Sequence, residues 1–182
     1  GKPLNRFLEE GGLGLEEVVD IIRQAATALM AAHEGAGTGE PLVHLDLKPE
    51  HVFLEKIQGR WHVKVIDFGV AEIVSATPVS EGESTGQLTG RVAGTLPYMA
   101  PERWQGVADP RCDIYSLGVI LYEVIAGVLP FGSRDPEALR QQHEREVPVP
   151  PSLRGGKGKR SAALRQLDAI TLRCLEKDPA MR

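Results

Sequence analysis

The chain has 182 residues, 42% of them hydrophobic and 25% charged, and a formal net charge of −4. This length and composition suit one soluble globular domain, and the acidic balance gives no electrostatic reason to expect nucleic acid or an anionic membrane as a partner. The two cysteines, Cys112 and Cys174, are far apart and form no Cys-x-x-Cys pair, which disfavours a zinc site or a disulfide framework. We therefore expect a cytoplasmic location and no membrane segment in these residues, while an anchor elsewhere in a longer protein is left open.

The N-terminal part of the chain predicts two helices. An apolar patch beginning at Leu4 indicates a short helix within residues 1–14. Apolar residues then recur at helical spacing and are followed by Gly35, which predicts an amphipathic helix over residues 15–34. This second helix leads into the segment 43–51.

Residues 43–51, with the sequence VHLDLKPEH, place two opposite charges close together. Asp46 and Lys48 lie within three residues before Pro49, and this proline disfavours a continuing helix. We expect both side chains to lie on a shaped loop, and loops on a rigid scaffold frequently carry catalytic groups.

The following segment predicts a β-hairpin that ends on a further acid. Residues 52–54 form a short apolar run, and residues 61–66 alternate large and polar side chains, with Gly59 in the turn between them. Because the two strands are antiparallel neighbours, we expect Asp67 to lie close to Asp46.

The middle of the chain predicts a long loop and then a buried helix. Residues 74–92 are rich in Ser, Thr, Gly and Glu without apolar periodicity, which predicts a mobile loop that returns through residues 94–102. Residues 111–127 are apolar nearly all round, so we expect a central helix in which Asp113 and Ser116 need partners.

The last third predicts more helices. Asp135 followed by Pro136 should begin one helix, residues 148–156 should form a loop, and Ser161 should cap the last helix. The predicted fold is therefore α+β, mainly α, with small β-hairpins beside the loop at 43–51.

Four motifs occur in the order found in the protein kinases and resemble that family's signature set. They are the catalytic loop His44–His51, the metal-binding triplet Asp67–Gly69, the end of the activation segment Ala100–Glu102, and the start of the central helix Asp113–Gly118. The resemblance covers residues 1–182. It is closest to the Ser/Thr kinases, including the eukaryotic-like (Hanks-type) kinases of bacteria, because Lys48 and Thr95 are marks of that class.

The resemblance implies a site for phosphoryl transfer, which needs positioning and charge neutralisation more than covalent help. It implies that Asp46 orients the substrate hydroxyl and accepts its hydrogen bond. Lys48 would hold the γ-phosphate of ATP, and Thr95 would tie the returning loop to both residues. Asp67 would bind Mg²⁺, which prefers oxygen ligands.

The resemblance implies further nucleotide contacts and structural roles. Phe53 would form the floor beneath the adenine, and Glu50 is placed among the nucleotide-binding residues. The structural residues implied are the stacked pair His44 and Phe68, Asp113 as holder of the catalytic-loop backbone, and the buried ion pair Glu102 with Arg182.

Two residues depart from the family pattern. His51 stands where the family has the Asn that binds a second Mg²⁺, and imidazole suits transition metals better than Mg²⁺. His51 could accept a hydrogen bond or bind Mn²⁺. The sequence therefore leaves open whether phosphoryl-transfer activity is retained or lost. Leu45 stands where many kinases have an Arg that pairs with an activation-loop phosphate, so we expect loop phosphorylation to matter less here.

The chain contains no glycine-rich loop, strand lysine or helix glutamate of the kinase N-terminal lobe. We therefore expect residues 1–182 to be a partial kinase domain, its C-terminal lobe without the N-terminal β lobe, inactive alone and poor at binding ATP. The expected partners are ATP, a protein substrate with Ser or Thr, and the missing lobe.

Three functions remain open at this point: an active Ser/Thr protein kinase, a pseudokinase that acts as a binding or scaffold module, and a kinase-like small-molecule phosphotransferase. The motif at 100–102 and the return at 94–98 argue against the third, because they build a platform for a peptide substrate.

Overall fold

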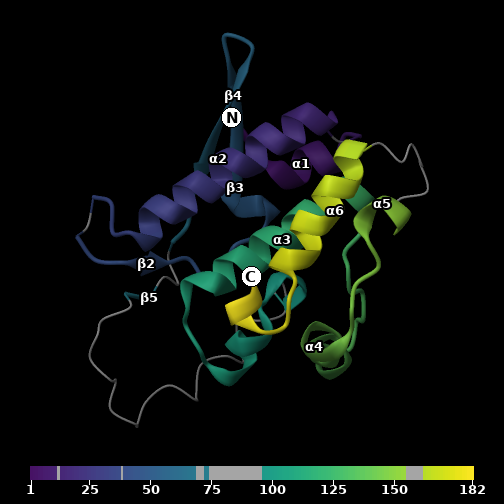
Figure 1. Ribbon diagram of the computed structural model, residues 1–182. Coiled ribbons are helices and arrows are strands. Elements are labelled where there is room, and N and C mark those ends of the chain that lie inside the picture. The colour runs from purple at the N-terminus through teal and green to yellow at the C-terminus, as the bar shows by residue number, and fades with distance from the viewer. Residues whose placement is uncertain (12, 38, 69–71, 74–95, 155–161) are drawn as a thin grey trace.

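The computed structural model describes residues 1–11, 13–37, 39–68, 72–73, 96–154 and 162–182. These residues are mainly helical, with small antiparallel sheets, as Figure 1 shows. The helices are α1 (Leu4–Glu9), α2 (Leu15–His33), α3 (Pro110–Ala126), α4 (Pro136–Arg145), α5 (Pro151–Arg154) and α6 (Ala162–Cys174). The strands are β1 (Lys2–Pro3), β2 (Leu42–Val43), β3 (Val52–Ile57), β4 (Arg60–Val65) and β5 (Glu72–Ile73).

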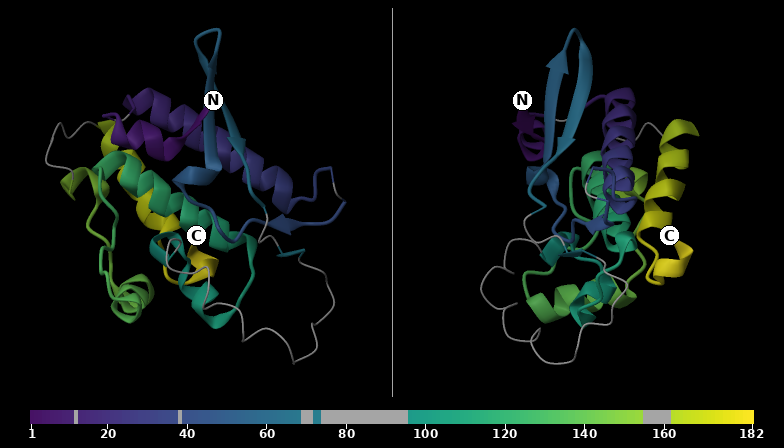
Figure 2. Two further views of the ribbon diagram at one scale, coloured as in Figure 1. Left: turned by 180° about the vertical axis from the view of Figure 1, so that it is seen from behind. Right: turned by 90° about the vertical axis from the view of Figure 1, so that its left-hand side faces the viewer.

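Helix α3 is the centre of the fold. Asp109 caps its first turn by accepting a hydrogen bond from the backbone of Arg111, at 2.8 Å, and Pro110 is its first residue. Helices α2 and α6 both pack along α3 (Figures 1 and 2). One side of α3, through Leu117 and Ile120, joins a core with α1, α2 and β3, whereas the other side joins a second core that contains Val43 and Leu45. The predicted central helix is thus confirmed.

Gly118 of α3 packs tightly against Cys174 of α6. A Cβ added to Gly118 would lie 2.5 Å from the Cβ of Cys174. We expect Gly118→Ala to destabilise the fold by about 1–3 kcal/mol through overpacking, although Ala is normally the better helix former. Thermal unfolding of the full-length protein measures this effect.

Gly132 offers the matched control for this substitution, because a Cβ added there meets nothing within 4 Å. Gly132→Ala should leave the unfolding temperature unchanged, and Cys174→Gly should restore much of what Gly118→Ala loses. An unfolding temperature for Gly118→Ala equal to that of Gly132→Ala would contradict the packing argument.

Strands β3 and β4 form the predicted hairpin, which projects from the helices in both views of Figure 2. Strand β3 is longer than the predicted 52–54, and β4 begins one residue earlier than the predicted 61–66, because the turn consists of Gln58 and Gly59 alone, both with positive φ (50° and 80°). The side chain of Gln24 closes the outer edge of β4, donating to the carbonyl of Trp61 at 3.0 Å and accepting from the amide of Val63 at 3.2 Å. Helix α2 therefore fixes the hairpin that carries the chain to Asp67.

The C-terminal third agrees with the prediction except at one point. Asp135 caps α4 by accepting from the amide of Ala138 at 2.7 Å. A loop was expected over residues 148–156, but Pro151–Arg154 form α5, because the carboxylate of Asp168 accepts hydrogen bonds from both the amide and the hydroxyl of Ser152. The predicted cap Ser161 and the predicted loop at 74–92 lie outside the described residues. Within the described ranges, no helix combines the length and apolar character needed to cross a membrane.

Candidate active site

The segment after β2 is held by Asp113, near the start of α3. Asp113 is fully buried, and its carboxylate oxygens accept hydrogen bonds from the amides of His44 and Leu45, each at 2.8 Å. Leu45 has φ of 64°, a left-handed conformation that costs a non-glycine residue about 1–3 kcal/mol. The side chain of Leu45 is buried in the core, and the next residue, Asp46, emerges at the surface of this core.

His44 joins this loop to the end of the hairpin. Its ring is fully buried, and Nε2 donates to the carbonyl of Ile66 at 3.0 Å. The ring centroid lies 4.6 Å from that of Phe68 and 5.4 Å from that of His51. Burial lowers the pKa of His44, which keeps the ring neutral and gives it a structural place in the core.

Four polar side chains meet where the loop and the hairpin end. Lys48 Nζ lies 3.0 Å from Asp46 Oδ2. His51 is buried, and its Nδ1 donates to the carbonyl of Asp46 at 2.8 Å, while its Nε2 lies 3.4 Å from Asp67 Oδ2. The structure therefore brings Asp67 beside the loop of Asp46, as the hairpin predicted. Asp67 also has a positive φ, 63°, and its carboxylate is largely exposed.

This donor set fits a divalent cation that is shared with a nucleotide. Asp67 offers exposed carboxylate oxygens, and the neighbouring His51 offers a ring nitrogen. No group of three or more His, Cys, Asp or Glu side chains arranged for a metal occurs in the part of the chain that the structure describes. Two protein ligands suit Mg²⁺ or Mn²⁺ bound to phosphate, because such ions take their remaining ligands from phosphate oxygens and water.

The remaining predicted contacts are placed as follows. Phe53 is half-buried on β3, on the face opposite to the buried Val52 and Leu54. Glu50 is exposed in a 3₁₀ turn, and Thr95 lies outside the described residues. The roles of these residues toward a nucleotide therefore stay predictions.

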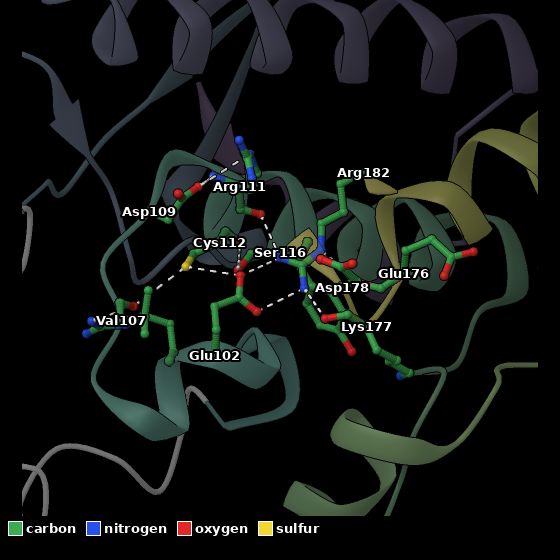
Figure 3. A network of polar contacts seen from close by, with 12 residues as sticks. Glu102, Val107, Asp109, Arg111, Cys112, Ser116, Glu176, Lys177, Asp178 and Arg182 are labelled. Carbon is green, nitrogen blue, oxygen red and sulfur yellow. Dashed lines mark hydrogen bonds and ion pairs between the residues drawn. The ribbon is translucent and has the colours of Figure 1, made fainter. Parts of the chain in front are cut away.

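Glu102 and Arg182 form the ion pair drawn in Figure 3. Arg182 Nη1 donates to Glu102 Oε1, and Nη2 donates to Oε2 at 2.9 Å. The guanidinium also lies over the ring of Tyr115, 4.8 Å from its centroid, and donates to the carbonyl of Arg111 at 3.1 Å. Burial alone would raise the pKa of Glu102, but the hydrogen bonds and charge of Arg182 hold it below its ordinary value.

The sequence of the chain matches one family model over its whole length, residues 1–182, and that family is described as the protein kinase domain. The chain belongs to the protein kinase family. Its curated relatives include serine/threonine-protein kinase PknB of Mycolicibacterium smegmatis, which is 37% identical over 95% of the chain and 25% of the relative. They also include serine/threonine-protein kinases pkn3 of Myxococcus xanthus and PknA of Mycobacterium tuberculosis, each 39% identical over 100% of the chain. The match covers 32% of the length of pkn3 and 37% of the length of PknA. The chain thus spans between a quarter and just over a third of these kinases.

The sequence reasoning missed one half-buried pair. The hydroxyl of Tyr98 donates to Glu123 Oε2, on α3, at 2.7 Å, and burial raises the pKa of Glu123. The nearby Glu50 raises it further. A glutamate inside the apolar run of α3 was the available signal, but its partner lies 25 residues away in the chain.

Proposed function

We propose that the protein is a Ser/Thr protein kinase and that residues 1–182 are the C-terminal lobe of its catalytic domain. The observation that carries this proposal is the cluster of Asp46, Lys48, His51 and Asp67, in which an acid, a cation and two metal-binding groups share one surface. The names of the relatives support transfer to Ser or Thr hydroxyls.

In this proposal Asp46 accepts the hydrogen bond of the substrate hydroxyl and takes its proton as the oxygen attacks the γ-phosphorus of ATP. The bond between the γ-phosphorus and the β,γ-bridging oxygen breaks, and ADP leaves with that oxygen. Lys48, 3.0 Å from Asp46, holds an oxygen of the γ-phosphate and neutralises its charge. A bound divalent cation supplies further charge neutralisation, and Asp67 and His51 are the residues that would hold it. Thr95 ties the returning segment to this pair, and Phe53 and Glu50 contact the nucleotide.

His51 gives this site a metal preference of its own. Because a carbonyl oxygen can only accept, the contact with the carbonyl of Asp46 places the proton of the neutral ring on Nδ1. The lone pair of Nε2 then faces Asp67, in position to act as a ligand. An imidazole nitrogen suits Mn²⁺ better than Mg²⁺, so we propose that the kinase prefers Mn²⁺.

Phosphate transfer by the full-length protein to a Ser- and Thr-containing protein tests the metal preference. We expect the wild type to be faster with Mn²⁺ than with Mg²⁺, and His51→Asn to reverse this order because an amide oxygen suits Mg²⁺. His62→Asn is the matched control, because His62 is exposed on the hairpin, and it should behave as the wild type.

This experiment also separates the active kinase from the pseudokinase. The pseudokinase stays a candidate because His51 replaces the Asn that binds metal in the family pattern. Absence of transfer with either metal, restored by His51→Asn, would support a pseudokinase that binds or scaffolds. Transfer to small molecules but to no protein would support the third alternative, a small-molecule phosphotransferase.

The lobe assignment predicts that the isolated 182-residue chain is inactive and binds ATP poorly, because residues that grip the phosphates would lie in a preceding N-terminal lobe. Calorimetric titration of this chain with ATP should give no binding in the micromolar range, in contrast to the full-length protein. Micromolar affinity of the isolated chain would contradict the assignment.

The free cysteines and the use of ATP support a cytoplasmic site of action.

A further inference from the structure

A cleft of about 520 Å³ lies between the N-terminal half of α2 and the outer end of the β3–β4 hairpin. Its helix wall includes Glu16 and Asp20, and its hairpin wall includes Arg60 and Trp61. None of the residues proposed for phosphoryl transfer is among the described residues that line it. Its size is that of sites for small molecules, which combine an apolar surface with a few placed polar groups.

Trp61 gives the cleft a rigid apolar surface. Its indole Nε1 donates to Glu17 Oε1 at 2.9 Å, and its backbone carbonyl accepts from the side chain of Gln24 at 3.0 Å. The ring of Phe7 meets the indole edge-on, with the two centroids 5.4 Å apart. The indole is only half-buried, so part of it is accessible in the cleft. Because these contacts fix Trp61 before any ligand arrives, little conformational entropy is lost when an apolar group packs on it.

Apart from the imidazole of His62, the titratable side chains of the cleft leave one acid and one base without a partner. Two ion pairs neutralise four of the charged side chains, Glu17 with Lys56 at 3.3 Å and Asp20 with Arg23 at 2.8 Å. The Glu16 carboxylate and the Arg60 guanidinium are exposed and make no hydrogen bond or ion pair within the part of the chain that the structure describes. Two free and opposite charges therefore line one cleft from opposite walls.

The three free features of the cleft match the three parts of an apolar α-amino acid. A guanidinium presents a planar fork that binds a carboxylate through two hydrogen bonds. A carboxylate accepts hydrogen bonds from an ammonium group, and an indole packs against aliphatic or aromatic side chains. We propose that the cleft binds a free apolar or aromatic amino acid, with its carboxylate on Arg60, its ammonium on Glu16 and its side chain on Trp61. A ligand with only one charge would leave one of the two charged side chains unpaired.

Calorimetric titration of the full-length protein with three related probes tests this proposal. Phenylalanine carries both charges, N-acetylphenylalanine lacks the ammonium, and phenylalanine amide lacks the carboxylate. We expect phenylalanine to bind about tenfold more tightly than either of the other probes, because each of them has lost one set of charge-assisted hydrogen bonds.

Two variants show which side chain holds which charge. Arg60→Gln should weaken the binding of phenylalanine about tenfold but leave that of phenylalanine amide unchanged, because this probe has no carboxylate. Glu16→Gln should weaken the binding of phenylalanine by a similar factor and leave that of N-acetylphenylalanine unchanged. Arg173→Gln, at an exposed position of α6, is the matched control and should bind all three probes as the wild type does.

Three results would overturn the proposal. The first is the absence of phenylalanine binding up to about 10 mM. The second is equal affinity of the wild type for the three probes, and the third is wild-type affinity for phenylalanine in either Arg60→Gln or Glu16→Gln. Because the readout is binding, a failure of the proposed kinase activity would not change the outcome of this experiment.

Discussion

Asp46→Asn is expected to reduce kcat of the full-length protein by about 10²–10⁴-fold, the usual contribution of a positioned general base. Asn keeps the size of the side chain but cannot accept the proton of the substrate hydroxyl. The loop itself should stay in place, because His51 is bound to the backbone carbonyl of Asp46 and not to its side chain. Affinity for ATP should therefore change little, and a steady-state comparison of kcat and KM measures both effects.

Asp20→Asn is the matched control for this substitution. Asp20 is a carboxylate on α2 that pairs at the surface with Arg23, 2.8 Å away, and takes no part in the proposed site. It should retain wild-type kcat. A kcat for Asp46→Asn equal to that of Asp20→Asn would show that Asp46 is not the base.

Arg182→Met is expected to destabilise the kinase domain by about 3–5 kcal/mol, the usual loss when one partner of a buried ion pair is removed. The substitution leaves Glu102 buried without a counter-charge, and the ring of Tyr115 loses its guanidinium neighbour. Arg173→Met, at an exposed position of α6, is the control and should change stability little. Denaturant unfolding of the full-length protein measures the difference between the two.

The effect of Arg182→Met should also depend on pH in a defined direction. The pKa of Glu102 lies below its ordinary value of 4.5 in the folded protein, so the pair stabilises the fold above that pH. This stabilisation is lost as the pH falls through the lower, folded pKa, because Glu102 then binds a proton. The free energies of unfolding of wild type and Arg182→Met should therefore converge in acid. If the difference between the two proteins were the same at neutral and acidic pH, the ion pair would not be the source of the effect.

Residue type and spacing predicted the elements that carry the site. The apolar run of α3, the alternation in β4 and the position of Pro49 after Lys48 place Asp46 and Asp67 correctly, because each depends on local patterns. Element limits were less predictable where a side chain overrides the local pattern. The positive φ of Gln58 shortens the turn, and the hydrogen bonds of Asp168 to Ser152 make a helix of an expected loop.

Contacts between residues far apart in the chain could not be predicted from the sequence. His33 and Asp113 are 80 residues apart, and nothing in either local pattern marks them as partners. The same holds for Tyr98 and Glu123, which meet only because the segment after residue 95 returns along α3. The sequence named His51 as an unusual residue, but the orientation of its ring, with Nδ1 on the loop and Nε2 on Asp67, required the fold.

Identification of the residues that receive phosphate is the most direct test of the proposed kinase. The full-length protein is incubated with Mn²⁺ or Mg²⁺, ATP labelled at the γ-phosphate and a protein acceptor, and the labelled amino acids are then separated. We predict labelled Ser or Thr with the wild type and none above background with Asp46→Asn. Absence of labelled Ser and Thr with both metals, or equal labelling by the two proteins, would contradict a Ser/Thr kinase that works through Asp46.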